Sequence, residues 1–176
     1  MKEDDIYIYP KITYMKIFVT NFKKFRLTLQ IIYFALLQWI LLTMAIFYFS
    51  AEKTYYKLDL SDTKILIGGM LVISALVFSP VLFRFMLSFV NREKAVKYKL
   101  SGYTTAYVLK MMILEVAAIV NLIFFEQSGN NYFMIFSVFP LLMMMFSYPA
   151  FNKLEGDLKS SMKESSYFRN TDKEFE

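Results

Sequence analysis

The chain of 176 residues contains no cysteine and no histidine, and these two absences remove most common catalytic chemistry. Without cysteine there is no disulfide, no thiolate nucleophile and no cysteine zinc site. Without histidine there is no Ser-His triad, no histidine metal site and no side chain that ordinarily titrates near neutral pH. We therefore expect no catalytic residue, no metal site and no cofactor, and we expect that the protein is not an enzyme.

Glycine and proline are scarce, at five and four residues, whereas hydrophobic residues make up 57% of the chain. A soluble domain is about 45–50% apolar by a similar count. The excess is concentrated in four long runs, and a helix of about 20 such residues crosses roughly 30 Å of hydrocarbon. The runs predict four membrane spans, at residues 31–49, 65–90, 104–125 and 132–151.

The positive charges predict how these spans are oriented. Fifteen of the 20 Lys and Arg residues lie in 1–30, in the 91–102 connection and in the tail, whereas the other two connections hold three. Because positively charged loops stay in the cytoplasm, we expect both termini to be cytoplasmic. The short 126–131 connection predicts a tight external turn. The expected fold is an all-α membrane protein, with four transmembrane helices in an antiparallel bundle.

Polar segments flank the predicted spans, which occupy residues 31–151. In 12–30 the apolar residues recur every three or four positions, and this spacing is typical of one helical face. One interpretation is a cytoplasmic amphipathic arm, residues 1–30, that lies on anionic lipid headgroups. The other is that the first transmembrane helix begins before residue 31 and extends into the cytoplasm. On the first interpretation, the residues that contact headgroups are Lys16, Lys23, Lys24 and Arg26. Residues 152–176 form a polar cytoplasmic tail.

Three ionisable residues lie inside the predicted spans, where a charge costs about 2.5–3.5 kcal/mol on insertion scales. Glu115 is expected near the midplane, about 18 Å along its helix. Lys110 is shallower, so we expect its long side chain to extend to the headgroups. Arg84 can extend in the same way or reach inward towards Glu115.

Three interpretations of Glu115 remain open. It is a protonated acid that hydrogen-bonds to another helix through Asn121, Gln38, a serine or a backbone carbonyl. Alternatively, it pairs with Arg84 or Lys110 and fixes the helix register. In the third interpretation it binds a transported cation or relays a proton.

The C-terminal half, from about Tyr98 to Leu158, carries a resemblance. The sequence YKLSGYTTAYVLKMMILEVAAIVNLIF, starting at residue 98, and PAFNKLEGDL, residues 149–158, resemble small four-pass membrane proteins of Bacteroidota-type bacteria. The resemblance implies four helices and a cytoplasmic tail in a bacterial cytoplasmic (inner) membrane, and it implies no activity. It marks Glu115, Pro149, Lys153 and Asp157 as family-like positions without assigned roles. Four-pass proteins of this size also occur as accessories of phage-defence loci, including type VI CRISPR loci.

Two functions follow as hypotheses. The first is a protein that acts non-catalytically by interaction, as an accessory, regulatory or immunity-type subunit. Its expected partners are the lipid bilayer, anionic headgroups and either another protein or further copies of itself; nucleic acid is not expected. The second is an oligomeric ion or proton channel, or a small transporter, that uses Glu115.

Overall fold

The computed structural model describes residues 22–51, 54–90, 96–150 and 156–157. These residues form four helices and no strand: α1 (Phe22–Ser50), α2 (Thr63–Val90), α3 (Val96–Ser128) and α4 (Asn131–Met145). The prediction of an all-helical protein with four helices is therefore confirmed for the part of the chain that is described.

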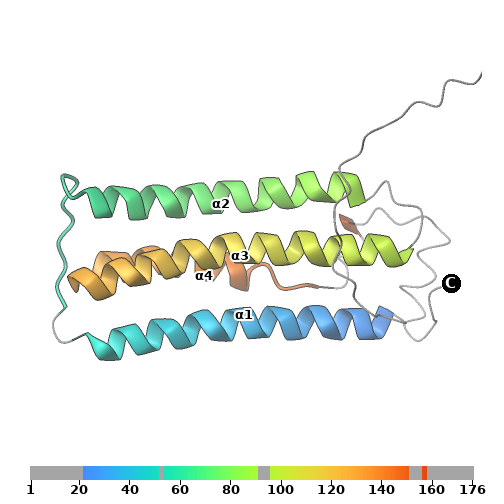
Figure 1. Cartoon of the computed structure of the whole chain (residues 1–176), viewed down its shortest axis with the longest axis horizontal. Helices are drawn as coiled ribbons and strands as arrows, with labels where there is room; N and C mark the ends of the chain where they lie inside the picture. The colour runs from blue at the N-terminus through green and yellow to red at the C-terminus, as the bar shows by residue number, and fades with distance from the viewer. Residues whose placement is uncertain (1–21, 52–53, 91–95, 151–155, 158–176) are drawn as a thin grey trace, which may run out of the picture.

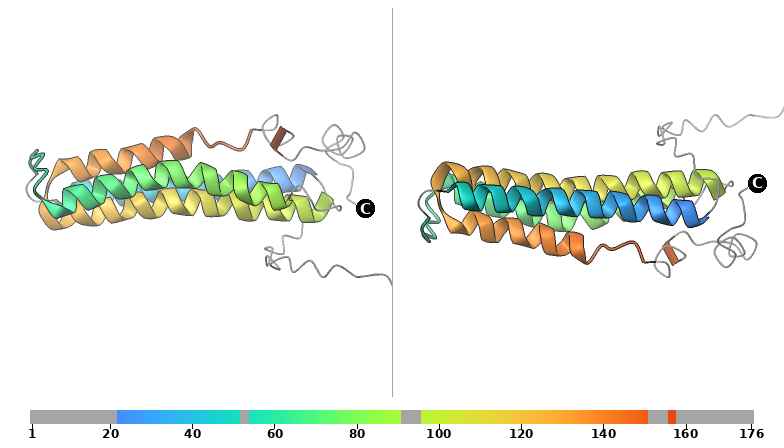
Figure 2. Two further views of the ribbon diagram at one scale, coloured as in Figure 1. Left: turned by 90° about the horizontal axis from the view of Figure 1, so that it is seen from above. Right: turned by 90° about the horizontal axis from the view of Figure 1, so that it is seen from below.

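The helices lie side by side, and successive helices run in opposite directions (Figure 1). α3 is the central helix and contacts the other three, while α1 and α2 lie on opposite sides of it. α4 packs against α3 and α2 and also touches α1, as the two views of Figure 2 show. This order makes the buried face of α3 the centre of the core.

Three of the helices are long and apolar enough to cross a membrane: α1, α2 and α3 with 29, 28 and 33 residues. Their outward faces are apolar as well; Ile73 is 65% and Phe85 58% exposed. Water would make such a surface unfavourable, whereas lipid tails match it. The long helices and their apolar exterior fit a membrane protein.

α4 is shorter than its apolar run. The sequence predicts a span over 132–151, but the helix ends at Met145 after 15 residues, or about 22 Å. The expectation that all four runs form helices of spanning length is therefore wrong for this one. Pro149 explains part of the difference, because proline lacks an N–H and disfavours the helical conformation in the residue before it.

Two of the other helices begin well before the predicted spans: α1 begins nine residues early, at Phe22, and α3 eight residues early, at Val96, whereas α2 begins two residues early, at Thr63. α1 begins at Phe22, so residues 22–30 are its first turns and continue directly into the predicted span at 31. Residues 1–21 of the predicted arm lie outside the described residues, as does the tail apart from residues 156–157.

The turn between α3 and α4 consists of Gly129 and Asn130, as its short polar sequence predicts. Gly129 has φ 70°, a left-handed conformation that glycine adopts without strain and that commonly ends a helix. Asn130 caps α4, since its side chain accepts a hydrogen bond from the Tyr132 N–H at 3.2 Å. The turn therefore fixes α3 and α4 as antiparallel neighbours.

Candidate functional site

The early end of α4 leaves backbone carbonyls among packed helices. The last carbonyls of any helix have no partner within the helix and carry partial negative charge. Here, Ser147 and Pro149, which follow α4 in the chain, are buried. In an apolar environment such carbonyls need hydrogen-bond donors from elsewhere in the protein.

Donors from α1 and α3 meet these carbonyls. The Tyr33 hydroxyl donates to the Met145 carbonyl at 3.2 Å, and the Tyr107 hydroxyl donates to the Ser147 carbonyl at 3.0 Å. The ring of Tyr148 packs edge-on against Tyr33, with 5.3 Å between the centroids. The helix end is thus held by tyrosines that lie far away in the sequence.

Lys110 completes this group. Its ammonium donates to the Ser147 hydroxyl at 2.7 Å and lies 5.4 Å from the centre of the Phe83 ring. Only 7% of the residue is exposed, so the prediction that Lys110 extends to the headgroups is wrong. The side chain turns inward because the end of α4 offers partial negative charge and an aromatic face. We call these residues the α4-end cluster: Tyr33, Tyr107, Lys110, Ser147 and Tyr148.

The structure does not bring the predicted charged residues together. Glu115 is half-buried on α3 and Arg84 is exposed on α2. Five residues separate Lys110 from Glu115, a rotation of about 140° around the helix, so the two side chains leave it in different directions. Among the described residues, Glu115 forms no ion pair with Arg84 or Lys110.

Gln38 and Asn121, the predicted hydrogen-bond partners of Glu115, are also placed elsewhere. Gln38 lies on the exposed face of α1. Asn121 is fully buried and donates to the Gly68 carbonyl of α2 at 3.4 Å and to the Ala117 carbonyl at 2.9 Å. Its amide therefore joins α3 to α2.

Asn121 lies at a close contact between α2 and α3. A Cβ atom at Gly68 would lie 2.5 Å from the Asn121 Oδ1 and 3.3 Å from the Phe133 ring of α4. Asn121 Oδ1 is buried and accepts no hydrogen bond in the described part of the chain. The absence of a side chain at Gly68 is thus what allows three helices to meet here.

A hydrogen-bonded segment covers the opposite end of the bundle from Asp157. The Tyr55 N–H donates to the Gly129 carbonyl at 3.0 Å, and the Asn131 N–H donates to the Tyr55 carbonyl at 2.9 Å. Nearby, hydrogen bonds from the Ser61 hydroxyl and N–H, together with Lys57, lower the pKa of Asp59 to about 2. These contacts order the connection between α1 and α2 and contain no catalytic arrangement.

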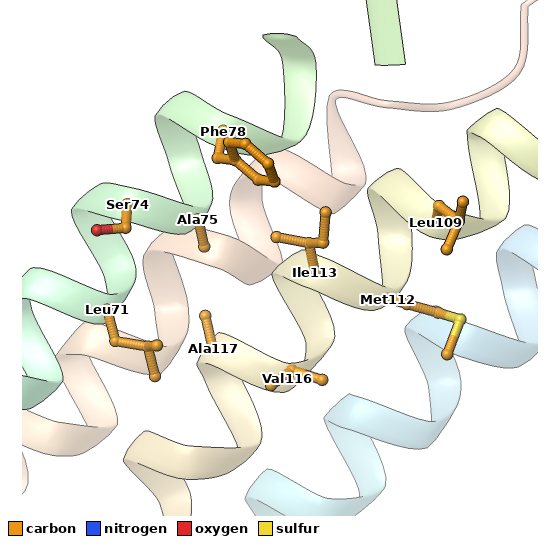
Figure 3. Close-up of a pocket in the computed structure, with 9 residues that line it drawn as sticks. All are labelled: Leu71, Ser74, Ala75, Phe78, Leu109, Met112, Ile113, Val116 and Ala117. Carbon is orange, nitrogen blue, oxygen red and sulfur yellow. The ribbon is translucent and has the colours of Figure 1, made fainter. Parts of the chain in front are cut away.

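The α2–α3 surface carries an open groove of about 340 Å³ (Figure 3). Its lining is apolar except for Ser74, whose hydroxyl points away from Ile113 and Val116 in the figure. Such a groove suits an acyl chain and offers no group for chemistry.

The predicted headgroup contacts fall at the start of α1. Lys23, Lys24 and Arg26 are exposed there, whereas Lys16 lies outside the described residues. Throughout the described ranges, no group of His, Cys, Asp or Glu residues is arranged to hold a metal ion.

Sequence reasoning missed the tyrosines of the α4-end cluster. Tyr33 and Tyr107 look like ordinary aromatic residues in apolar runs, and their hydroxyls gain a role only because α4 ends at Met145. The one available signal was the Ser-Tyr-Pro sequence at 147–149, because proline predicts a helix end inside an apolar run.

Chemically, the α4-end cluster holds and orients backbone. The Lys110 ammonium lies 2.7 Å from the Ser147 hydroxyl, but that hydroxyl is buried and donates to the Met143 carbonyl at 2.7 Å, so it is engaged in holding the helix end. Comparison with protein-family models, curated proteins and solved structures finds no match to this chain. The function is therefore argued from the geometry alone.

Proposed function

We propose that the protein is a four-pass protein of a bacterial cytoplasmic membrane that acts non-catalytically by binding other proteins, as an accessory, regulatory or immunity-type subunit. The observation that carries this proposal is the gathering of chain segments at one end of the bundle. α1 begins there, α2 ends there and α3 begins there (Figure 1). Asp157 lies at the same end, where its carboxylate accepts a hydrogen bond from the Tyr103 hydroxyl at 3.4 Å.

A fourth crossing accounts for the α4-end cluster. Non-helical backbone is tolerated at membrane depth only where it is buried in protein or lines a cavity. The carbonyls of Met145 and Ser147 have hydrogen-bond partners within the protein, since they accept hydrogen bonds from the Tyr33 and Tyr107 hydroxyls. Residues 146–150 then continue this crossing without helical structure, and the Tyr33 and Tyr107 hydroxyls supply hydrogen bonds to the Met145 and Ser147 carbonyls.

The distribution of positive charge supports a cytoplasmic location for the end of the bundle at which α1 and α3 begin. Fifteen of the 20 Lys and Arg residues belong to residues 1–30, 91–102 and 152–176, and a cytoplasmic excess of positive charge is the general rule. Lys23, Lys24 and Arg26 would then face anionic headgroups. A partner protein would be met on this side, because the described connections at the other end are short.

The transporter alternative has weaker support. Lys110 and Asn121 are buried on α3, and the buried residues between them include Leu114 and Ala118, which are apolar. Glu115 leaves the helix in a different direction from Lys110. A cation or proton path needs polar groups in sequence, and this arrangement separates them.

Affinity capture with a C-terminal tag in gentle detergent tests the proposal, with a chain that ends at Asp157 and carries the same tag as the matched control. We expect the full chain to recover a partner protein that the shortened chain does not. Ion and proton flux through proteoliposomes, measured for the wild type and Glu115→Gln, tests the alternative. Recovery of the protein alone, together with a flux that Glu115→Gln abolishes, would contradict the proposal.

A further inference from the structure

Gln38 has no partner within the described chain. It is exposed on α1, next to Trp39, at the middle of a 29-residue apolar helix. Counting 1.5 Å per residue, its Cα lies about 18 Å from the helix end at Ser50. Among the described residues its amide makes no hydrogen bond. An amide surrounded by hydrocarbon is strongly unfavourable unless it is hydrogen-bonded, so its position calls for a partner outside this chain.

The packing of α1 shows that Gln38 points away from the rest of the protein. The residues of α1 that are buried, such as Phe25, Leu29 and Ile40, face α3 and α4. Gln38 lies two residues from Ile40, which places it about 160° away around the helix. No rotation of the side chain brings its amide to the core.

Around Gln38, the exposed face has the spacing of a helix–helix contact. Its residues are spaced alternately by four and three positions, and all are exposed; they are Ile31, Ala35, Gln38, Leu42, Ala45 and Phe49. We call this row the α1 seam. A 3.5-residue repeat keeps one row against a partner helix in a left-handed pair, and small residues such as the two alanines let the backbones approach.

A second copy of this chain satisfies Gln38 directly. The strong bias of Lys and Arg towards one side gives every copy the same orientation, so two α1 helices meet parallel, with Gln38 of each at the same depth. A two-fold axis then sets the same residues opposite each other. Because an amide carries both donors and an acceptor, each Gln38 can donate to the other. An unrelated partner would need its own polar group at this depth.

We infer that α1 is the interface of a parallel homodimer, held by the α1 seam with Gln38 at its centre. The inference requires that α1 spans the membrane, and it does not depend on the proposed function. It assigns the outward face of α1, which the rest of the bundle leaves uncovered.

Disulfide crosslinking of the full chain in native membranes tests this inference cleanly, because the protein has no cysteine of its own. Ala35→Cys and Leu42→Cys place single thiols on the seam, where close helices allow a disulfide. The matched controls are Trp39→Cys, on the same helix but off the seam, and Ile73→Cys on α2, where Ile73 is 65% exposed. We expect covalent dimers from the seam positions only. Equal crosslinking at the control positions, or none on the seam, would overturn the inference.

Two substitutions of Gln38 test the amide itself. In the Leu42→Cys chain, Gln38→Leu removes the hydrogen bonds, whereas Gln38→Asn keeps an amide. We expect Gln38→Leu to weaken dimerisation about 3- to 30-fold, as measured by titration against lipid, and Gln38→Asn to retain most of it. Because Gln38 is exposed within its own chain, the helix content of each variant should be unchanged and serves as the folding control. Unchanged dimerisation in Gln38→Leu would show that the amide does not hold the pair.

Discussion

The side chain of Lys110 is buried, whereas lysines in membrane helices usually extend to the headgroups. Its ammonium lies between the Ser147 hydroxyl and the Phe83 ring and is nearly excluded from the surface. A helix C-terminus stabilises positive charge, and an aromatic face adds to this where water is excluded. Lys110 therefore stabilises the irregular chain after α4, and it does so only because α4 ends early.

Tyr107 offers the clearest test of the α4-end cluster. Replacing it by Phe removes the hydroxyl that donates to the Ser147 carbonyl and leaves that buried carbonyl without this donor. We expect Tyr107→Phe to lower the free energy of unfolding by about 1–3 kcal/mol. Chemical denaturation in detergent measures this change.

Tyr56→Phe is the matched control for this prediction. Tyr56 is 71% exposed and its ring lies against Tyr132, a contact that Phe preserves. We expect its stability to stay within about 0.5 kcal/mol of the wild type. If the two variants behaved alike, the tyrosine hydroxyl would not be what holds the end of α4.

At the scale of elements, the contact between α2 and α3 depends on one of two adjacent glycines. At Gly68 a Cβ would collide with Asn121 Oδ1, whereas at Gly69 the nearest atom lies 3.7 Å away, in the Phe136 ring. We expect Gly68→Ala to destabilise the protein by about 1–3 kcal/mol through overpacking. Gly69→Ala should instead stabilise it by about 0.5–1 kcal/mol, since alanine favours the helix. Thermal unfolding of both variants measures the difference.

A second substitution tells whether the collision is with Asn121. Adding Asn121→Ala to Gly68→Ala removes the oxygen that the new methyl group meets. The loss in the double variant should then be smaller than the sum of the two single losses, by about 0.5–3 kcal/mol. Strictly additive losses would place the origin of the effect elsewhere.

The helices themselves are largely predictable from the sequence, and their ends less so. Long apolar runs predict α1, α2 and α3 because a run of this length has one stable form in a bilayer, a helix. The end of α4 was not predictable from hydropathy, since the run continues to 151 while the helix stops at Met145. The stop depends on Pro149 and on donors such as Tyr107, which lies 40 residues away from Ser147.

At the scale of the whole molecule, the sequence does not show which side of each helix faces the core and which side faces outward. A helix that is apolar all round has no polar side to orient it, so neither the inward turn of Lys110 nor the outward position of Gln38 could be predicted. Both orientations depend on which residues of each helix pack against its neighbours. For the same reason the predicted contacts of Glu115 with Arg84 and Lys110 do not form among the described residues.

The arrangement of the whole molecule also explains what the non-helical residues 146–150 do. α4 alone is about 22 Å long, yet Asp157 lies beside Tyr103, seven residues into α3. The chain therefore returns to the end at which α1 begins. In a membrane this places the start of α1 at Phe22 and Asp157 on the same side.

Substituted-cysteine labelling tests the central claim, the four-pass topology, most directly. In the cysteine-free chain, Thr54→Cys and Gly156→Cys each add one exposed thiol, and a side chain at Gly156 would meet no atom within 4 Å. A membrane-impermeant maleimide is applied to intact spheroplasts and then to permeabilised ones. The account predicts that Thr54→Cys is labelled in both and Gly156→Cys only after permeabilisation. Labelling of both Thr54→Cys and Gly156→Cys in intact spheroplasts would show that only three helices cross and would contradict the four-pass topology.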